Sequence, residues 1–535
     1  MDRVGARLGI DRFELTVLVA LSGLSMAILA GLALKGRALT GADGVLASDQ
    51  LQYFTWIREA SDTFLVGNAY DFKPDDHTFL HPGFLLSGLV HRITGLSIPV
   101  SYLLLWKPVA VGLAFTGALM YTRRMLTGVG ARRAGLVLIL FSVMPATAFV
   151  AWSGWGGKPR QYTFDFISGE MWTGQYLWGY LMTGIAVFLM PLVLLAVERW
   201  RDERRTRLLV YASLGALIVC WLQPWQGGTL ALVVVGTEAV WWLKHRGRPT
   251  WGVLAVGAAV AVPAVYYFAL SMWDPAWELA GSSNAAGSQT TWNWPWWAIL
   301  LSVLPLALPA ALAYRLPARD WQSVAVRLWP FAALAVYLQP TGTFPYHSFQ
   351  GLAIPLSILA VQGVLSVWRR PDPRVVVAAL VLMCVPGTIH KAEVALNSVQ
   401  SAGDPYYVFP GEQQAMDALE RDPRPGGVLS SPYGGHMLPY KTGREVWVGA
   451  LSWTPDWDER VGLADAVFVR GVSPARTRRI VRDSKARFVF VDCRPGLRDL
   501  TPALAPLTES VRRYGCATVY VLRKRPDMAT PSRSR

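Results

Sequence analysis

Charged side chains are scarce in this sequence. Asp, Glu, Lys and Arg make up 16% of its 535 residues, whereas 53% are hydrophobic. A soluble protein of this length needs more charge to cover its surface. The composition therefore argues against a chain that is soluble throughout, and it predicts that most of the chain lies in a lipid bilayer.

Signatures of soluble enzymes are also absent. The sequence has no H-E-x-x-H, no G-x-S-x-G and no G-x-G-x-x-G that opens a helix. The run Gly156-Gly157-Lys158-Pro159 is not a P-loop, because Pro159 stands where a Ser or Thr must hold magnesium. ATP-driven transport therefore has no support, and no cofactor is expected with certainty.

Cysteines are few, and none forms a metal-type C-x-x-C pair. Cys220 and Cys384 fall in apolar runs, whereas Cys493 ends one expected strand and Cys516 begins another. If these two strands are neighbours in an oxidising compartment, a disulfide can join them. We therefore hypothesise a Cys493–Cys516 bridge.

A histidine pair offers weak evidence for a metal. His77 and His81 have the spacing of a helical zinc pair, but Pro74 and Pro82 bracket them and no third ligand is obvious. A divalent metal is compatible with this pattern but unsupported by it.

The sequence contains many long apolar runs. A spanning helix needs about 20 mainly apolar residues, and the sequence has about eleven such stretches, a few of them short. The first stretch is expected to stay in the protein as a helix rather than to be removed as a signal peptide, because no small-residue cleavage site follows it. The stretches cover residues 15–34, 103–121, 134–151, 173–197, 208–222, 228–243, 253–270, 296–314, 328–338, 352–368 and 375–389.

The sequence has more basic than acidic residues, 51 Lys and Arg against 36 Asp and Glu. The basic residues are concentrated in alternate loops between the apolar stretches, which argues against a nucleic-acid-binding surface. With the N-terminus in the cytoplasm, every cytoplasmic loop is basic, and the short opposite loops carry only Lys158 and Arg160. An odd number of spans then places the C-terminus outside the cell. The basic segments are residues 3–12, 123–133, 199–207, 244–248, 315–327 and 369–374.

The first exterior loop, residues 36–107, is expected to fold at the membrane surface. In residues 49–65 apolar positions recur at helical spacing, which predicts an interfacial amphipathic helix. Ser48 is placed to cap this helix, with Asp49 in its first turn, where a negative charge suits the helix dipole. A second interfacial helix is expected over residues 82–94.

In the C-terminal part, short β-rich runs alternate with helical patterns, which predicts a compact exterior α/β domain. The expected strands are 426–430, 446–451, 466–469, 488–491 and 518–522, and the expected helices are 413–421 and 475–484. The domain boundaries are therefore 1–393 for the transmembrane part, 394–524 for the α/β domain and 525–535 for a disordered tail.

Polar residues near a membrane are costly unless they serve a polar cavity, and here they concentrate on the outer side. The candidate binding residues are Gln50, Tyr53, Arg58, Glu59, His81, Lys158, Arg160, Glu170, Gln223, Trp225, His347 and Gln350. Tryptophans cluster with them, at positions 152, 155, 172, 225, 273, 292, 294, 296 and 297. The tryptophans fit an interfacial belt, and beside amides and carboxylates they also fit a sugar site.

Four segments carry a family resemblance: residues 47–61 (ASDQLQYFTWIREAS), 81–84 (HPGF), 427–431 (GVLSS) and 440–449 (YKTGREVWVG). With one span before them and an α/β domain at the far end, they resemble bacterial membrane glycosyltransferases of superfamily C, related to protein mannosyltransferases. The resemblance implies a sugar donor on a polyprenyl phosphate and an acidic catalytic base in the first exterior loop. Asp49 is the matching position.

The sequence departs from the family pattern at two places. Gln223-Pro224-Trp225 stands where relatives often carry His-Pro, and Pro345-Tyr346-His347-Ser348-Phe349 stands where they often carry an Arg-Phe pair. In place of that Arg, His347, Lys158 or Arg160 would contact the donor phosphate.

The resemblance implies a hexosyl- or pentosyltransferase of the cell envelope. Asp49 would deprotonate an acceptor hydroxyl on a lipid, glycan or protein, the anomeric carbon would invert, and Tyr53 and Trp56 could wall the sugar. Simpler alternatives stay open: Asp49 as a structural helix-start carboxylate, Arg58 and Glu59 as a solvated pair, and Glu170 as a loop charge.

Two other functions also remain. One is a non-catalytic transporter or scaffold for lipid-linked glycans, although neither inverted repeats nor polar residues through the membrane midplane are apparent. The other is a glycan polymerase or ligase that uses an oligosaccharide donor. The identity of the sugar, the acceptor and the linkage cannot be read from the sequence.

Overall fold

A computed structural model of the protein describes residues 9–34, 38–44, 46–73, 77–246, 250–290, 295–339, 344–367, 372–398 and 405–524. Arg3, Arg7, Pro74, Arg248, Trp292, Trp294, Arg369, Arg370 and the tail 525–535 lie outside the described residues. The chain divides into two compact units. The helical unit comprises Met1–Ile28, Trp106–Phe268 and Ala285–Ala395, and the α/β unit comprises Leu29–Leu105, Ala269–Asn284 and Leu396–Arg535.

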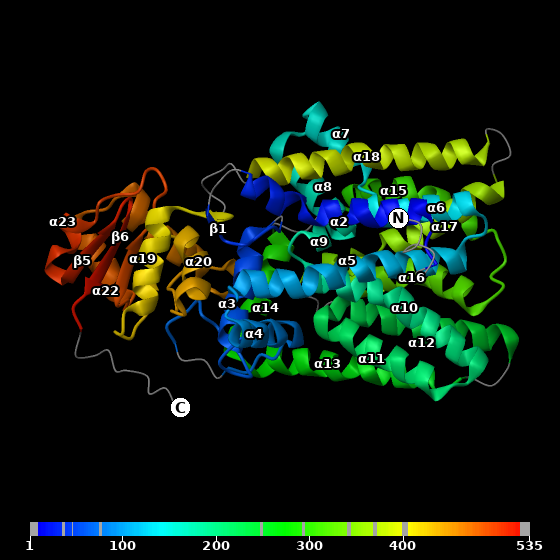
Figure 1. Cartoon of the computed structure of the whole chain (residues 1–535), viewed down its shortest axis with the longest axis horizontal. Helices are drawn as coiled ribbons and strands as arrows, with labels where there is room; N and C mark the ends of the chain where they lie inside the picture. The colour runs from blue at the N-terminus through cyan, green and yellow to red at the C-terminus, as the bar shows by residue number, and fades with distance from the viewer. Residues whose placement is uncertain are drawn as a thin grey trace. The chain divides into compact units, whose positions relative to one another are not determined.

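Long helices that run roughly parallel to one another build the helical unit (Figure 1). Helix α15 packs on α17, α10 on α11 and α12 on α16. The helices lying wholly or partly in this unit are α2 (Arg12–Ala33), α5 (Ile98–Met125), α6 (Val129–Phe141), α7 (Pro145–Ser153), α8 (Gly157–Met171), α9 (Thr173–Leu177), α10 (Leu181–Glu203), α11 (Thr206–Leu222), α12 (Pro224–His245), α13 (Val253–Trp273), α15 (Trp296–Ala313), α16 (Trp321–Tyr337), η1 (Pro345–Phe349), α17 (Ala353–Val367) and α18 (Pro373–Ser398).

Close helix contacts hold this unit together. A Cβ atom on Gly363 of α17 would collide with the carbonyl oxygen of Pro309 on α15, so only glycine lets these two helices approach as closely as they do. Arg124 at the end of α5 pairs with Glu198 of α10 at 2.5 Å and with Asp320, the N-cap of α16, at 2.7 Å. These ion pairs tie three helices together at their basic ends.

The number of spanning helices differs from the expected eleven. Among the described residues, six helices are long and apolar enough to cross a membrane: α2, α5, α10, α13, α15 and the Arg374–Val394 part of α18. A seventh span results if α6 and α7, which meet at a 50° bend, count as one. Helices α11 and α17 are apolar but shorter. The count of about eleven is therefore not confirmed.

Breaks inside the expected apolar stretches explain part of this difference. The stretch 134–151 is interrupted between α6 and α7, where Pro145 starts a new helix. The stretch 173–197 is also interrupted, between α9 and α10 around Gly179, whose φ is +115°, but α10 still counts as a span. Hydropathy alone does not show such breaks, because the interrupting residues are themselves mostly apolar.

Exposed apolar side chains on this unit fit a lipid environment. Val265 and Phe268 of α13, Leu308 of α15 and Leu382 of α18 are each more than 60% exposed. Apolar patches of this kind would make a soluble protein aggregate, whereas hydrocarbon accepts them without penalty. The helical unit is therefore the multi-pass membrane part of the chain.

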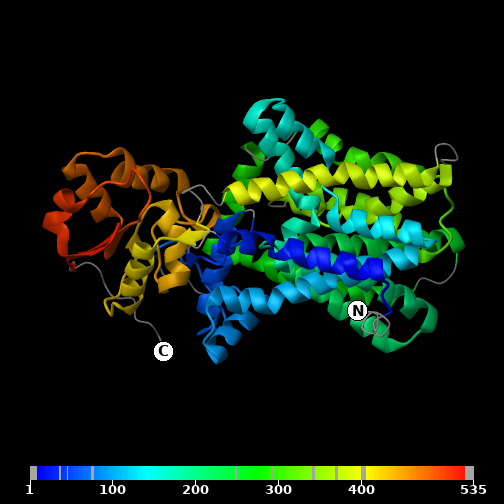
Figure 2. The ribbon, with the colours of Figure 1, turned by 45° about the horizontal axis from the view of Figure 1, so that its top comes forward.

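The α/β unit combines the first expected exterior loop with the C-terminal residues (Figure 2). Strand β1 (Ala38–Leu39) pairs antiparallel with β2 (Tyr407–Val408). A second sheet has the order β3-β4-β6-β5, with β3 (Val428–Leu429) parallel to β4 (Phe488–Val491), and with β6 (Ala517–Leu522) antiparallel to both β4 and β5 (Thr508–Tyr514). The helices are α3 (Ala47–Ala60), α4 (Pro82–Thr94), α14 (Pro275–Thr290), α19 (Pro410–Arg421), α20 (Pro432–Thr442), α21 (Trp457–Asp465), α22 (Pro474–Asp483) and α23 (Thr501–Leu504).

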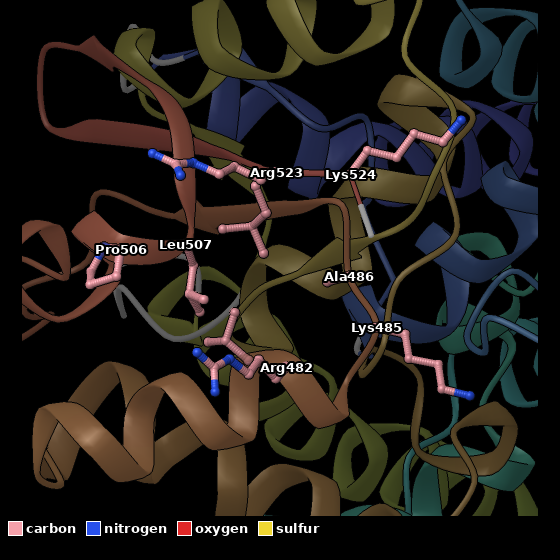
Figure 3. A pocket seen from close by; sticks show the side chains of 9 residues that line it. Arg482, Lys485, Ala486, Pro506, Leu507, Arg523 and Lys524 are labelled. Atoms are coloured by element: carbon pink, nitrogen blue, oxygen red, sulfur yellow. The ribbon is translucent and has the colours of Figure 1, made fainter. Parts of the chain in front are cut away.

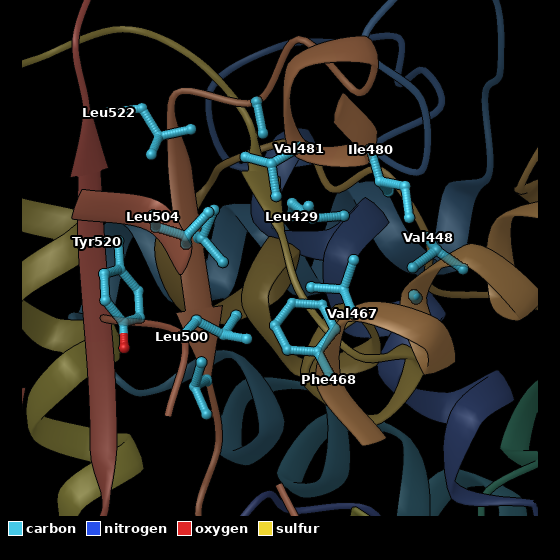
Figure 4. Packing of buried hydrophobic residues seen from close by; sticks show 14 residues of the cluster. Leu429, Val448, Val467, Phe468, Ile480, Val481, Leu500, Leu504, Tyr520 and Leu522 are labelled. Carbon is cyan, nitrogen blue, oxygen red and sulfur yellow. The ribbon is translucent and has the colours of Figure 1, made fainter. Parts of the chain in front are cut away.

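One hydrophobic core lies between this sheet and its helices (Figure 4). Phe468 and Ile480 from the helical segments pack with Leu429, Val489 and Tyr520 from the strands. The expected strands 488–491 and 518–522 and both expected helices are confirmed. The expected strand 466–469 is wrong, because these residues form the helical turn η3 (Ala466–Arg470).

The sheet differs from the expectation at two further places. The expected strand 446–451 reduces to an isolated bridge between Val446 and Val428. Strand β5 was not expected, since its residues TESVRRY are mostly polar. They alternate between half-buried and exposed, which is the pattern of an edge strand with one face in contact with water.

The hypothesised disulfide is confirmed. Cys493 follows β4, Cys516 lies in the turn between β5 and β6, and the structure joins the two sulfurs, with the Cα atoms 5.0 Å apart. Pairing of β4 with β6 brings these positions together. The bridge therefore closes a loop inside the α/β unit.

Removing this bridge should destabilise the α/β unit. In the Cys493→Ser/Cys516→Ser variant we expect the free energy of unfolding to fall by about 3 kcal/mol, because the reduced chain regains loop-closure entropy in the unfolded state. Urea unfolding of the purified chain, followed through protease resistance of the C-terminal residues, measures the change. Two free thiols at these positions in protein purified without reductant would contradict the bridge.

Candidate functional site

Asp49 lies in the first turn of α3 and is half-buried. The helix begins at Ala47 after Leu46, with no side-chain cap, so the expectation that Ser48 caps it is wrong: Ser48 already lies inside the first turn. Tyr70 is close enough for the charge of Asp49 to add to the effect of burial, and together they raise the pKa of the Tyr70 phenol. Asp49 is therefore a carboxylate at a helix start, beside a phenol that keeps its proton.

The loop before α3 is fixed by Gln50. Its side-chain oxygen accepts from the backbone N–H groups of Asp43 and Gly44 at 2.8 and 2.9 Å, and its amide nitrogen donates to the Asp43 carboxylate at 3.0 Å. The side chain of Gln50 is 1% exposed. These bonds hold the backbone just ahead of Asp49, so Gln50 positions the start of the helix.

Arg58 and Glu59 connect the end of α3 to other parts of the α/β unit. Arg58 donates to the carbonyl oxygens of Tyr440 and Lys441 at 3.0 Å each, at the end of α20, and pairs with Glu420 of α19 at 2.5 Å. Glu59 accepts from the N–H of Gly67 and contacts the ring of His77. Each side chain thus has a local structural partner.

His81 is the N-cap of α4. Its Nδ1 accepts from the N–H of Phe84 at 3.4 Å, and its ring stacks on that of Phe84 at 3.9 Å. Burial lowers the pKa of His81 to about 3, so the ring is neutral at physiological pH. Among the described residues, no group of three His, Cys, Asp or Glu side chains could hold a metal, and His77 and His81 have other partners.

The aromatic residues near Asp49 form a packed cluster. Trp56 is 7% exposed, lies 5.0 Å from Phe79 and 5.1 Å from Trp453 between ring centroids, and donates its indole N–H to Gly67. The role of Trp56 as a wall for a sugar stays a prediction, and in this structure its ring packs against other rings. Tyr53, half-buried and 5.2 Å from Phe84, remains as a ring that can meet a ligand.

Predicted residues of the helical unit converge on Glu170, near the end of α8. Its side chain is 2% exposed, and its Oε2 lies 2.8 Å from Nε2 of Gln350 and 3.0 Å from Nδ1 of His347. Gln223 donates to the side-chain oxygen of Gln350 at 2.7 Å, and Trp225 meets the His347 ring edge-on at 4.9 Å. We call these five residues the polar cluster.

Local sequence explains how three separate segments reach this point. Pro224 starts α12 directly after Gln223, which ends α11, so the chain turns there with the Gln223 amide directed inward. Pro345 likewise begins the short helix η1, which presents His347 and leads to Gln350. Thr183 of α10 accepts from Gln223, and Gln226 donates to the carbonyl oxygen of His347.

The carboxylate of Glu170 sets the protonation of His347. A hydrogen bond from Nδ1–H to a carboxylate favours the tautomer with the proton on Nδ1, which leaves Nε2 as the basic nitrogen of the neutral ring. The Gln350 amide nitrogen lies 3.0 Å from the same Nδ1. The His347 side chain is 25% exposed, so it is the most accessible ionisable group of the cluster.

Lys158 and Arg160 do not join the polar cluster. They lie at the start of α8, and the ten residues from Arg160 to Glu170 correspond to about 15 Å along a helix. Arg160 lies over the rings of Trp155 and Trp297, at 4.1 and 5.4 Å from the centroids, and Lys158 is exposed. Of the three expected phosphate contacts, only His347 therefore belongs to the cluster.

Sequence reasoning missed a second buried group of charges on α8 and α18. Nε2 of His390 and Nζ of Lys391 lie 3.2 and 3.5 Å from Oδ1 of Asp165, and both basic side chains are at most 5% exposed. Lys391 also interacts electrostatically with Glu170. His390 and Lys391 directly follow the last apolar stretch, and ionisable residues at such a place could have drawn attention to them.

Comparisons with known proteins give only distant similarity. No family model matches the chain, and no curated protein matches it. Among solved structures, the apo oligosaccharyltransferase of Archaeoglobus fulgidus aligns with a TM-score of 0.47 at 12% identity, over 89% of this chain and 69% of that one.

Two further solved structures show the same level of similarity. ArnT from Cupriavidus metallidurans, solved with undecaprenyl phosphate, aligns with a TM-score of 0.46 at 11% identity, over 95% of this chain and 97% of that one. AglB from Archaeoglobus fulgidus, solved with an inhibitory peptide and a dolichol-phosphate, has a TM-score of 0.41, 14% identity, and coverage of 90% and 69%. At these values the function has to be inferred from the side chains of this chain.

Proposed function

We propose that this chain is a membrane glycosyltransferase. It moves a hexosyl or pentosyl group from a polyprenyl-phosphate carrier to an acceptor hydroxyl at the outer face, with inversion at the anomeric carbon. The observation that carries the proposal is the polar cluster, because a buried carboxylate, an imidazole and two amides in the membrane part of the chain are costly unless they serve a polar ligand. The sequence resemblance of residues 47–61 supports Asp49 as the base.

The proposed reaction is a single displacement. Asp49 takes the proton of the acceptor hydroxyl as its oxygen forms a bond to the anomeric carbon. The bond between that carbon and the phosphate oxygen breaks, and its electron pair leaves with the polyprenyl phosphate. A basic group stabilises the charge that develops on the phosphate. Within the helical unit we separately propose His347 as a contact of the donor phosphate, with Glu170 as its positioning residue.

The transfer can be tested with donor from the cell of origin. Lipid-linked sugars extracted from a deletion strain are incubated with the purified protein and membrane acceptors, and released polyprenyl phosphate is measured by mass spectrometry. We expect release together with a product whose anomeric configuration, read by NMR, is opposite to that of the donor. Movement of intact lipid-linked sugar across a vesicle membrane without release would instead indicate a transporter.

The proposed orientation places the N-terminus in the cytoplasm and the α/β unit outside. A single cysteine at Ser282, which is exposed, or at Ser401 should react with an impermeant thiol reagent in intact cells, whereas one at Thr206 should not. Background labelling should be low, because Cys220 and Cys384 are buried and Cys493 and Cys516 are bonded. The reverse labelling would overturn the orientation and the outer-face assignment.

A further inference from the structure

The α/β unit contains a pocket that the proposed chemistry does not use (Figure 3). Its volume is about 280 Å³, slightly below the range of roughly 300–1,000 Å³ that holds drug-sized ligands. The end of α22, the turn before β4, the segment before β5 and the end of β6 contribute to it. All its lining residues therefore come from positions 481–524, away in sequence from Asp49 and its loop.

The floor of the pocket is apolar and rigid. Val481 and Leu522 belong to the hydrophobic core and are 1% and 6% exposed. The backbone N–H of Arg523 donates to the carbonyl oxygen of Leu507 at 2.9 Å, which ties the end of β6 to the segment before β5. Pro506 and Leu507 complete this surface. It offers a fixed hydrophobic face of the kind on which the C–H face of a sugar ring packs.

The rim of the pocket is basic. Four cations line the pocket, namely Arg482, Lys485, Arg523 and Lys524, and in Figure 3 the Lys485 and Lys524 side chains extend outward from the floor. The described lining residues include neither Asp nor Glu. All four side chains are exposed. In the described part of the chain, Lys485, Arg523 and Lys524 form no ion pair, so their charge is available to a ligand.

Other arginines of the α/β unit are arranged differently. Asp422 pairs with Arg424 at 2.9 Å and with Arg512 at 3.0 Å, and Arg487 pairs with Glu509 at 2.8 Å. Because the unit supplies carboxylates to these cations, the basic rim is a local departure from charge balance. Such a concentration of one sign attracts ligands of the opposite sign.

Lys485 has an unusual backbone conformation. Its φ is +59°, a left-handed value that glycine adopts without strain and that other residues adopt at an energetic cost. Glycine commonly occupies this position after a helix, here just past α22. A lysine at such a position therefore fits a role for its side chain.

We infer that this pocket binds an anionic sugar residue, bearing a carboxylate or a phosphate, of the envelope glycan that accepts the transferred sugar. The cations meet the anion, and the floor formed by Pro506, Leu507 and Leu522 meets the ring. None of the described lining residues is aromatic, so the pocket lacks the stacking surface on which single-stranded nucleic acids bind. The choice of a glycan rests on the proposed function, whereas the binding itself is measured without catalysis.

Binding is tested on the full-length protein in nanodiscs, by calorimetry with tetragalacturonate as the probe. Fully methyl-esterified tetragalacturonate has the same rings without the charge, and inorganic phosphate has the charge without the ring. We expect the first probe to bind more tightly than either of the others. In Lys485→Gln/Arg523→Gln its affinity should fall by at least about tenfold, since charged hydrogen bonds are lost.

A matched control removes the same charge elsewhere. Arg470→Gln/Arg513→Gln eliminates two exposed arginines of the α/β unit, which lie 4.0 and 3.8 Å from aspartates outside the pocket. This variant should bind tetragalacturonate like the wild type. Lys485→Gly gives a second check, because glycine suits the backbone there and folding is preserved, and it should still weaken binding.

Several results would overturn the inference. One is an equal loss of tetragalacturonate affinity in the pocket variant and in the control variant. Another is binding of the methyl ester or of inorganic phosphate as tight as that of tetragalacturonate. A third is an undiminished tetragalacturonate affinity in Lys485→Gly. Binding to phosphatidylglycerol vesicles that depends on the rim, without any binding of tetragalacturonate, would assign the pocket to a membrane surface instead. Binding by an Asp49→Asn protein that is inactive in transfer would support the pocket independently of the catalytic proposal.

Discussion

Replacing Asp49 with asparagine should lower the rate of polyprenyl phosphate release by about 10²–10⁴-fold, the usual contribution of a positioned general base. Asparagine keeps the size of the side chain and its preference for a helix start but cannot take a proton at neutral pH. Asp49 is half-buried in the first turn of α3, and Gln50 fixes the loop before it. The loss should therefore be chemical rather than structural.

A neighbouring carboxylate provides the control for this prediction. Asp62 follows the end of α3 and is exposed, so Asp62→Asn removes one negative charge from the same segment without affecting the proposed base. We expect near-normal activity from it. Near-normal activity of Asp49→Asn in well-inserted protein would exclude Asp49 as the base, and Glu170 would become the next candidate.

Glu170→Gln should give the second largest effect, a decrease of about 10–100-fold, equivalent to losing hydrogen bonds to a charged group. The carboxylate of Glu170 accepts from both His347 and Gln350. A glutamine there keeps the shape but loses the charge that holds the imidazole proton on Nδ1. His347 would then lose its orientation.

The kinetics separate this positioning role from a general loss of structure. A defect in phosphate stabilisation should lower kcat more than it changes KM, because the interaction with the leaving phosphate grows in the transition state. Glu203→Gln, which alters an exposed carboxylate at the end of α10, should leave both unchanged. An unaltered kcat in Glu170→Gln would remove the polar cluster from the reaction.

Much of the architecture follows from the sequence because its causes are local. Scarce charge predicts the helical membrane part, and alternating short apolar runs predict β4 and β6. The Cys493–Cys516 bridge could be hypothesised since these cysteines flank two expected strands, whose pairing would bring them together. The same reasoning failed for η3, where the apolar run Ala466–Arg470 is helical although its β-branched residues favour a strand.

The candidate site was less predictable because tertiary contacts create it. Glu170, His347 and Gln223 were each selected for being polar on the outer side, but nothing in their sequence positions predicts that they share hydrogen bonds. Their meeting depends on how α8, α12 and η1 pack. The burial of Trp56 likewise depends on Trp453, almost 400 residues later, so local pattern could not show that its ring packs against other rings.

The central claim, transfer of a sugar from a lipid carrier, is tested most directly by the glycans of a deletion strain. Mass spectrometry of its lipid-linked and envelope glycans should show accumulation of one polyprenyl-phosphate sugar and loss of that sugar from one envelope component. Wild-type protein should restore both, and Asp49→Asn should restore neither. Unchanged lipid-linked and envelope glycans in the deletion strain would contradict the claim.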